Sequence, residues 1–255
     1  LIQVGFVELN AAAIANTGVT VHDHFTLNGK FTLRPTDTLH LITGAQLNGT
    51  YSAVNYIATD FDLATNKQAL LKYDGVNNGV VLPIGTVQYY LPATVTATGV
   101  SDYTASVFEG ITNEGTLTGN AFTGSEKLTV VNAVWQINRV NGTGAADLQL
   151  GWDAALEGTT FNTLPDTDIG IIENTGTSWG LPSGTANNTN NTATTTIGNF
   201  GSFSVGAIPQ TEPFVFNPLP SKTYGDADFN GGATSLNTTQ PLVYSSSNTT
   251  VATIV

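Results

Sequence analysis

A stretch of alternating apolar and polar residues at 128–152 constrains the fold more than any other feature of this sequence. Each of its two runs gathers apolar side chains on one face: Ala133, Trp135 and Ile137 in the first run, and Leu148, Leu150 and Trp152 in the second. A period of two is typical of a half-buried β-strand. The connecting Asn141-Gly-Thr-Gly144 readily supplies the positive φ angles that hairpin turns need. We therefore expect a β-hairpin here, with the rest of the chain packed around it.

The predicted hairpin has the composition of a core rather than of a reaction site. It contains no histidine and no cysteine, and the charged residues in or beside it are few: Arg139, Asp147 and Asp153. We expect its two strands to form the centre of the hydrophobic core.

The overall composition favours an all-β fold. Charged residues make up 10% of the chain, against roughly 25% in average globular domains, and Thr, Asn, Gly, Val and Ala take their place. β-Branched side chains suit a pleated surface, and Gly and Asn suit tight connections. We predict an all-β protein whose main part is an antiparallel β-sandwich. At 255 residues the chain is long enough for more than one module.

The charge balance excludes several kinds of partner. Seven Lys and Arg residues against 19 Asp and Glu residues give a formal net charge of −12. Phosphate backbones and anionic lipids repel such a chain, so we expect neither nucleic-acid binding nor attachment to a membrane surface. No apolar run approaches the roughly 18 residues of a membrane span, so we do not expect membrane insertion.

Two residue types are missing from the chain. The absence of Cys removes disulfides, thiol catalysis and cysteine-ligated zinc. Met is also absent, and the sequence begins at Leu1. We therefore expect a processed or internal segment of a longer protein.

The spacing of the apolar runs predicts four regions. In 1–50, short strands recur about every six to eight residues, a rhythm similar to β-solenoid coils, and we expect a β-repeat cap there. Longer apolar runs in 51–207 fit the β-sandwich. Residues 208–216 contain Pro, Gln and Glu, which is typical of a linker. The fourth region is 217–255.

Several segments of the sequence carry a resemblance to known proteins. In the fourth region these segments are Pro220-Ser-Lys-Thr-Tyr-Gly-Asp-Ala-Asp228, Gly232-Ala-Thr234, Pro241-Leu-Val-Tyr-Ser-Ser-Ser-Asn248 and Val251-Ala-Thr-Ile254. They resemble the opening half of Ig-like repeats in very long surface proteins of Bacteroidetes-type bacteria. The central region is similar to another module of those proteins, through Val134-Trp135-Gln136-Ile137, 148–152, Ser178-Trp179 and 200–206. A β-repeat region often precedes that module, and 19–60 fits this place.

The resemblance implies an extracellular protein at the bacterial cell surface. It also implies a mechanical role, as a stalk, an adhesin scaffold or a filament subunit. The partners expected from it are other copies of this chain or neighbouring repeats of the same parent protein. The sequence departs from the family in two ways, because the Ig-like repeat stops about halfway and no C-terminal sorting domain follows.

Half an Ig-like repeat has a physical consequence. Segments below roughly 40 residues rarely stabilise a core alone, and half a sandwich exposes strand edges that pair with another chain. We expect 217–255 to be completed by a neighbouring subunit of a fibre or by a continuation of the chain. The residues assigned to this assembly segment are Phe214, Phe216, Tyr224, Tyr244, Val251 and Ile254.

Two patterns offer metal ligands, and a simpler interpretation competes with each. The first is a set of oxygen ligands for Ca²⁺, the one cofactor considered: Asp60, Asp62 and Asn66. Extracellular modules often bind this ion weakly, but aspartates that form turns are the favoured interpretation. The second is a histidine set: His22, His24 and His40. The first two lie on one face of a strand at a spacing that suits zinc or copper, but histidines that face solvent are favoured.

No catalytic residue is predicted. The glutamates are scattered over expected loops and strand ends, without the facing pair that glycoside hydrolysis needs. A phosphate-binding glycine loop does not occur in the sequence, so a phosphoryl-transfer site is not indicated. We expect a protein that is not an enzyme.

Sugar binding without catalysis is the alternative function, as a carbohydrate-binding module of an adhesin or of a polysaccharide-degrading protein. The candidates for stacking on sugar rings are Trp179, in the turn-like Gly176-Thr-Ser-Trp-Gly180, and the pair Tyr89 and Tyr90. Core packing is the competing interpretation for Trp179. Exposed coplanar aromatic rings would favour sugar binding, whereas buried tryptophans with strand exchange between chains would favour the structural role.

Short modification patterns also occur. Asp37-Thr38-Leu39 resembles the O-glycosylation acceptor pattern of Bacteroidetes-type bacteria, with Thr38 as the acceptor. Sequons such as Asn48-Gly-Thr50 matter only in a host that glycosylates asparagine. Neither pattern decides the function.

Overall fold

The computed structural model describes residues 2–207, 215–216, 218, 221–223, 225–234 and 243–251. The chain divides into two compact units, Leu1–Ile208 and Pro209–Val255. Strands joined by turns and short 3-10 helices make up the described residues, which confirms the predicted all-β class. Within these residues no helix is both long enough and apolar enough to cross a membrane.

The N-terminal part of the first unit winds alternately through two parallel sheets. The first sheet takes β1 (Ile2–Leu9), β3 (Val19–Leu27), β5 (Thr38–Leu41) and β10 (Leu70–Asn77). The second takes β2 (Ala13–Ile14), β4 (Phe31–Leu33), β7 (Ile57–Thr59) and β12 (Ile84–Gly85). Neighbours in both sheets pair in parallel. Each turn of the chain, which we call a coil, therefore adds one strand to each sheet.

The coils continue to Gly85, beyond the boundary at residue 50 that the apolar spacing predicts. They lengthen along the chain, since Ile2 pairs with Val19 whereas Thr38 pairs with Leu70. The longest coil also carries β6 (Gln46–Asn48), which pairs with β3, and the hairpin of β8 (Phe61–Asp62) and β9 (Lys67–Gln68). Because these insertions remove any fixed period, sequence spacing cannot reveal the later coils.

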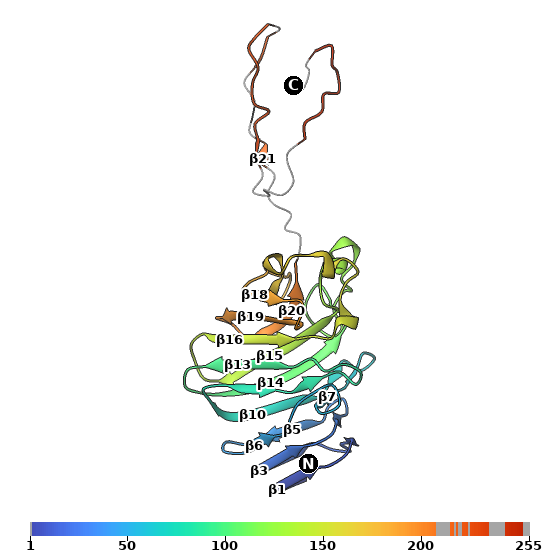
Figure 1. Cartoon of the computed structure of the whole chain (residues 1–255), viewed down its shortest axis with the longest axis vertical. Coiled ribbons are helices and arrows are strands. Elements are labelled where there is room, and N and C mark those ends of the chain that lie inside the picture. Colours follow the sequence, from blue (N-terminus) through green and yellow to red (C-terminus); the bar gives the residue numbers. More distant parts are fainter. Residues whose placement is uncertain are drawn as a thin grey trace. The chain divides into compact units, whose positions relative to one another are not determined.

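At β10 the first sheet changes from parallel to antiparallel pairing. It continues through β14 (Val100–Glu109), β15 (Ala133–Asn141), β20 (Gly201–Gly206) and β17 (Gly170–Asn174), and becomes a nine-stranded sheet. Figure 1 shows its strands stacked in succession from β1 through β14. A separate antiparallel sheet of five strands contains, in this order, β11 (Val80–Leu82), β13 (Ala93–Ala97), β16 (Ala146–Gly151), β19 (Thr192–Ile197) and β18 (Thr185–Asn187). The 3-10 helices are η1 (Gly124–Thr129), η2 (Ala154–Leu156), η3 (Phe161–Thr163) and η4 (Asp166–Asp168).

The hairpin predicted for 128–152 is wrong, although its two strands exist as β15 and β16. β15 pairs with β14 and β20 in the nine-stranded sheet, whereas β16 pairs with β13 and β19 in the five-stranded sheet. The turn between them crosses from one sheet to the other, with Gly142 and Gly144 at φ 105° and 86°. Each strand has one apolar face in either arrangement, so local alternation cannot distinguish them. The long-range strand partners decide.

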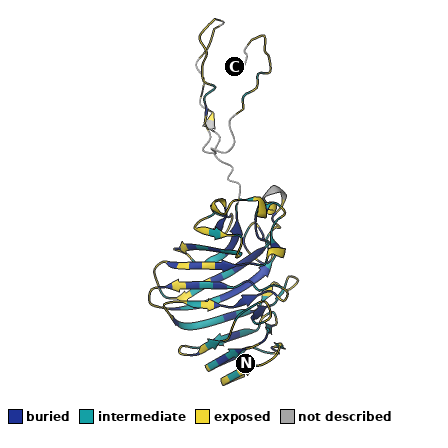
Figure 2. Cartoon of the chain, in the orientation of Figure 1, coloured by how far each residue is buried: buried dark blue, intermediate teal, exposed yellow. Residues whose placement is uncertain are grey.

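One hydrophobic core runs through the coils and both antiparallel sheets. Trp135 and Ile137 of β15 and Leu148 and Leu150 of β16 are all 0% exposed, which confirms that these strands form its centre. The same cluster extends into the buried faces of β3, β5 and β10. The Trp135 Nε1–H donates to the carbonyl oxygen of Leu91 at 3.0 Å, so the buried indole has its partner. Figure 2 shows this buried interior in dark blue.

A smaller apolar cluster covers the opposite face of the nine-stranded sheet near β17. Its members are Phe108, Ile111, Leu117, Phe122, Val130, Val134, Ile172 and Trp179. Val107 and Trp135, which are adjacent in sequence to two of these residues, belong to the main core. Because alternate residues of a strand point to opposite faces, β14 and β15 are buried on both sides here.

The second unit contains a short antiparallel pair, β21 (Val215–Phe216) and β22 (Ala233–Thr234). Three of the predicted assembly residues lie in its described part: Phe216 and Val251, which are exposed, and Tyr244, which is half-buried. The other three lie outside the described residues: Phe214, Tyr224 and Ile254. Their role in assembly stays a prediction.

Candidate functional site

Both parallel sheets end at the N-terminal coil in a strand with one unpaired edge. In the described part of the chain, β1 is the last strand of the nine-stranded sheet and β2 is the last strand of the four-stranded sheet. β1 pairs with β3, and β2 pairs with β4. An edge strand presents a row of backbone N–H and C=O groups with which another strand can pair. This end, which we call the open coil end, therefore offers one such edge in each sheet.

The open coil end exposes large apolar side chains. Ile2, Phe6 and Ile14 are 51%, 62% and 59% exposed. Figure 2 shows exposed and half-buried residues on the strand nearest the N-terminus. All three side chains belong to the edge strands, Ile2 and Phe6 to β1 and Ile14 to β2.

One coil further in, equivalent side chains are fully covered. Val4 and Val7 are only partly buried against the core, but their partners in β3, Val21 and Phe25, are 0% and 1% exposed. The difference is the cover that β1 gives to β3. A strand added to β1 would bury Val4 and Val7 in the same way, and burial of apolar surface contributes roughly 25 cal/mol per Å².

Charge does not protect the open coil end. Glu8 is the only charged side chain before Asp23, and no proline precedes Pro35. Natural edge strands are commonly protected by Lys, Pro or bulges. β1 has an irregular register with β3 between Val4 and Phe6, but it has neither Lys nor Pro. The end is thus almost uncharged in a chain of net charge −12.

Sequence reasoning missed Ile2, Phe6 and Ile14 as functional residues. Apolar content predicts a strand over much of the first ten residues, but it does not show whether that strand is central or at an edge. The usable signal was the long proline-free run before Asp23, in which Glu8 is the only Asp, Glu, Lys or Arg. Only the pairing order of the strands turns this run into an open edge.

Trp179 does not offer its ring for sugar stacking. It is 9% exposed, it belongs to the smaller apolar cluster, and its Nε1–H donates to the carbonyl oxygen of Thr112 at 2.8 Å. The competing interpretation of core packing is therefore correct for Trp179. An isolated bridge between Asn174 and Trp179 also ties this residue to the outer edge of β17.

Tyr89 and Tyr90 are both half-buried. Tyr89 packs against the main core, and the ring of Tyr90 lies 5.5 Å from that of Tyr56, centroid to centroid. Burial raises the pKa of the Tyr90 hydroxyl. Both rings take part in packing, so the exposed coplanar pair expected of a sugar platform is not formed by them.

The residues considered for Ca²⁺ form a hairpin turn. Asp62 Oδ1 accepts from the backbone N–H of Ala64 at 2.9 Å, and its Oδ2 accepts from the Thr65 hydroxyl at 2.8 Å. The hydrogen bond from Thr65 is the main reason why the pKa of Asp62 is lowered. Asn66 has φ 52°, a turn conformation, and Asp60 Oδ1 accepts from the next backbone N–H. These contacts support the interpretation of turn-forming aspartates.

The histidines do not converge on one point. His40 Nε2 lies 2.7 Å from Asp74 Oδ2, which is also 3.4 Å from Lys72 Nζ. His24 Nδ1 lies 2.6 Å from Asp23 Oδ1. Among the described residues no three His, Cys, Asp or Glu side chains form a group that could hold a metal ion. Thr38, the predicted O-glycosylation acceptor, is half-buried in β5.

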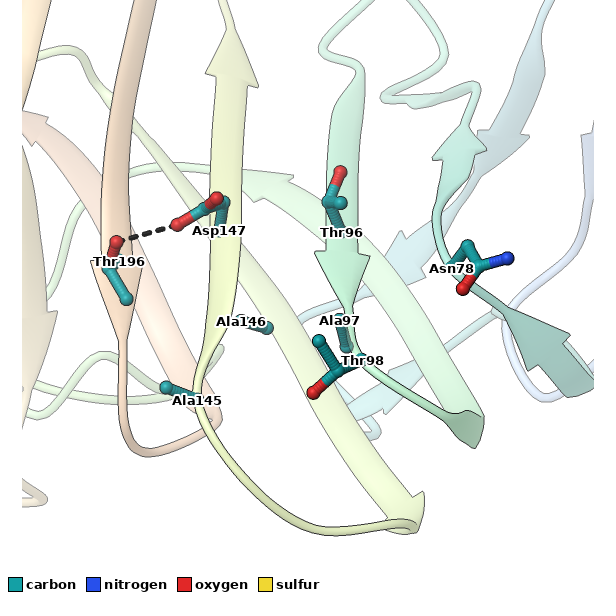
Figure 3. A pocket seen from close by; sticks show the side chains of 8 residues that line it. All are labelled: Asn78, Thr96, Ala97, Thr98, Ala145, Ala146, Asp147 and Thr196. Carbon is teal, nitrogen blue, oxygen red and sulfur yellow. Dashed lines mark hydrogen bonds between the residues drawn. The ribbon is translucent and has the colours of Figure 1, made fainter.

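A polar hollow of about 330 Å³ lies at one end of the five-stranded sheet. Figure 3 shows Asp147 of β16 and Thr196 of β19 facing each other, with the Thr196 hydroxyl donating to Asp147 Oδ1 at 2.6 Å. Thr96 and Asn78 also line the hollow, together with small alanines. Among the described residues that line the hollow, Asp147 alone carries a charge, and Thr and Asn side chains supply the other polar groups.

Comparison of the chain with protein-family models, with curated proteins and with solved structures finds no match. The functional argument therefore rests on the geometry of the chain itself.

Proposed function

We propose that this chain is a non-catalytic structural segment of an extracellular bacterial surface protein, whose open coil end takes a further coil by strand addition, from a second copy of the chain or from a neighbouring repeat of the same parent protein. The finer architecture that we propose is a β-solenoid that merges into an antiparallel β-sandwich, followed by a partial Ig-like module. The observation that carries the proposal is the pair of unpaired apolar edges at one end of the coils. Continuous strand pairing from β1 to β17 supports a rigid scaffold, because every added coil extends both sheets.

The partner must supply two strands. A single extended peptide would pair with β1 or with β2 and leave the other edge open. A coil supplies one strand for each sheet, as every coil within this chain does. A neighbouring repeat of the parent protein meets this requirement with a coil of its own, and a second copy of this chain meets it through its own open coil end.

A second copy can meet this end only through the same end of its own coils. At the other end, the larger sheet continues from β10 into antiparallel strands. The smaller sheet finishes at β12, where Gly85 bridges to Tyr90 and the Leu91 N–H donates to the Ile84 carbonyl oxygen at 3.0 Å. Pairing of identical ends gives a closed two-fold pair. Growth into a filament would need a second contact, for which the predicted assembly segment is the candidate.

Gln3→Pro tests strand addition without removing a known bond. The Ile2 N–H donates to the Gly18 carbonyl oxygen on the β3 side, and successive residues of a strand direct their backbone groups to opposite edges. The N–H of Gln3 therefore faces the open edge. Proline there blocks an added strand and is tolerated at an edge.

The measurement is sedimentation of the full chain over a range of concentrations. We expect the natural chain to form pairs, Gln3→Pro to be monomeric, and the control Gln3→Thr, which keeps the N–H, to pair like the natural chain. Circular dichroism and thermal melting check that all three are folded alike. A natural chain that stays monomeric at the highest soluble concentration would disprove pairing through this end.

A second candidate function, binding of an uncharged glycan, is favoured by the polar hollow of Figure 3. Its hydroxyl, amide and carboxylate groups match the hydroxyls of a neutral sugar. Glycan arrays with the natural chain and with Thr96→Val test it. Binding that survives Thr96→Val unchanged would place any glycan elsewhere.

A further inference from the structure

A second hollow, of about 510 Å³, lies beside the first two coils. It is on the outer face of the four-stranded sheet, because Phe31 and Leu33 of β4 point into the core and Thr32 between them lines the hollow. Ile14, the partner of Thr32 in β2, also lines it. This volume is within the range of roughly 300–1,000 Å³ that is typical of small-molecule sites.

Two basic side chains line this hollow in a chain that has only seven Lys and Arg residues. They are Lys30 and Arg34. Among the described residues neither takes part in a salt bridge. With one acidic residue, Asp60, also in the lining, two basic residues still leave the hollow with a net positive charge in a protein of net charge −12, which favours an anionic ligand there.

Lys30 is held in position before any ligand arrives. Its Nζ donates to the carbonyl oxygen of Val87 at 2.9 Å and lies 5.8 Å from the centre of the Tyr56 ring. An ammonium group has three N–H donors, so this contact leaves two for a ligand. Arg34 adds a planar guanidinium, which binds a carboxylate through two parallel hydrogen bonds.

The remaining lining residues restrict the kind of anion. Asp60 adds one negative charge to the hollow, and its Oδ1 already accepts from the Phe61 N–H at 2.8 Å. Its other oxygen suits a hydroxyl donor, whereas a single group with more than one negative charge, such as a phosphate, would be repelled. Ile14 and Val87, which are 59% and 41% exposed, offer apolar surface to the C–H groups of a ring.

We propose that this hollow binds a carboxylated saccharide. Arg34 and Lys30 would bind the carboxylate, Asp60 and Thr32 would bond ring hydroxyls, and Ile14 would contact the apolar face of the ring. This goes beyond pairing of chains at the open coil end. The saccharide has two sources, a free sugar acid or one residue of an acidic polysaccharide.

The test is ligand-observed NMR and titration calorimetry on the full chain. The probes are glucuronate, glucose, acetate and a soluble polyglucuronate. We expect glucuronate to bind at least about tenfold more tightly than glucose, which lacks the carboxylate for charge-assisted hydrogen bonds, and than acetate, which lacks the ring and its hydroxyls. Tighter binding of the polymer would identify the polysaccharide as the source, and equal binding per sugar would identify the free acid.

Matched variants distinguish binding at this hollow from a nonspecific effect of the protein's charge. Arg34→Ala should weaken glucuronate binding by about tenfold or more, and Arg34→Lys by less, because lysine keeps the charge but loses the planar pair of donors. The control Lys127→Ala removes one positive charge outside the lining of this hollow and should leave affinity unchanged. Equal binding of glucuronate and glucose, or full binding by a folded Arg34→Ala chain, would overturn the proposal. Acetate that binds as tightly as glucuronate would also overturn it.

Discussion

The two edges of the nine-stranded sheet have the same backbone chemistry and different surroundings. At one edge β1 is unpaired and exposes Ile2 and Phe6. At the other edge, β17 is covered by residues 175–184, which we call the covering segment. The Gly180 N–H donates to the Glu173 carbonyl oxygen at 2.8 Å, and the Ser183 N–H donates to the Ile171 carbonyl oxygen at 2.9 Å.

The covering segment is held by packing rather than by charge. Trp179 inserts into the smaller apolar cluster and hydrogen-bonds Thr112. The outer edge of β17 is thus occupied by the chain itself, and no Lys or Pro is needed in that strand to protect it. The comparison teaches that a strand edge stays available for pairing where no segment of the described residues covers it.

The largest effect on stability is expected from removing Trp179, the residue that holds the covering segment against the smaller apolar cluster. Trp179→Ala should lower the free energy of unfolding by about 3–5 kcal/mol, because it deletes a buried aromatic ring and its hydrogen bond. It should also free the edge of β17 and increase self-association. Urea unfolding and size-exclusion chromatography measure the two effects.

Trp179→Phe is the matched control, since it keeps most of the apolar contact but loses the hydrogen bond to Thr112. We expect its free energy of unfolding to fall by about 1–2 kcal/mol and its self-association to equal that of the natural chain. A Trp179→Ala chain as stable as the natural one would contradict the idea that the cluster holds the cover in place.

A smaller effect is expected at the end of the covering segment, where Gly184 has φ 86°. A Cβ at this position would overlap the Thr194 carbonyl oxygen. Gly184→Ala should therefore cost about 2–3 kcal/mol, from steric overlap added to the strain of a left-handed conformation. Gly176→Ala is the control, because Gly176 has φ 98° but no atom within 4 Å of its added Cβ; it should cost only about 1 kcal/mol.

The coil half of the molecule should respond to alkaline pH. Burial raises the pKa of Tyr51 to about 12, with the charge of Tyr73 as a second cause, and burial also raises the pKa of Tyr56 to about 12. The ordinary value is 10.0, so the folded chain holds these protons more tightly than the unfolded chain. Their contribution to stability is complete below pH 10 and is lost as the pH rises through about 12.

Unfolding midpoints in urea across this pH window measure the effect. The double variant Tyr51→Phe and Tyr56→Phe cannot ionise at these positions, and its stability should fall less steeply between pH 10 and about 12. Two parallel curves would show that these hydroxyls do not control alkaline unfolding.

The smallest effect on stability is expected at the open edge. Phe6→Ser should change the free energy of unfolding by less than about 0.5 kcal/mol, because Phe6 is 62% exposed, yet it should weaken pairing of chains. Val140→Ser is the control, since Val140 is 61% exposed and lies in β15, far along the sheet from β1. Equal association of the two variants would mean that pairing does not use the β1 edge.

Local sequence determined the all-β class and the centre of the core. The alternation around Trp135 and Leu148 indicates which face of each strand is apolar, and that face is the one buried in the core. The low charge content and the many Thr, Asn and Gly residues favour strands and turns wherever they occur. These properties depend on neighbouring residues alone, so they can be predicted without knowing strand partners.

Tertiary structure decided what the sequence left open. Whether β15 and β16 form a hairpin or cross between sheets depends on β13, β14, β19 and β20, which are distant in sequence. Trp179 is buried because the β14–β15 loop folds over it, and a turn-like sequence gives no sign of that loop. The exposure of Ile2 and Phe6 has the same origin. An apolar strand is buried when another strand lies beside it and exposed when none does, and only the three-dimensional pairing order determines which case holds.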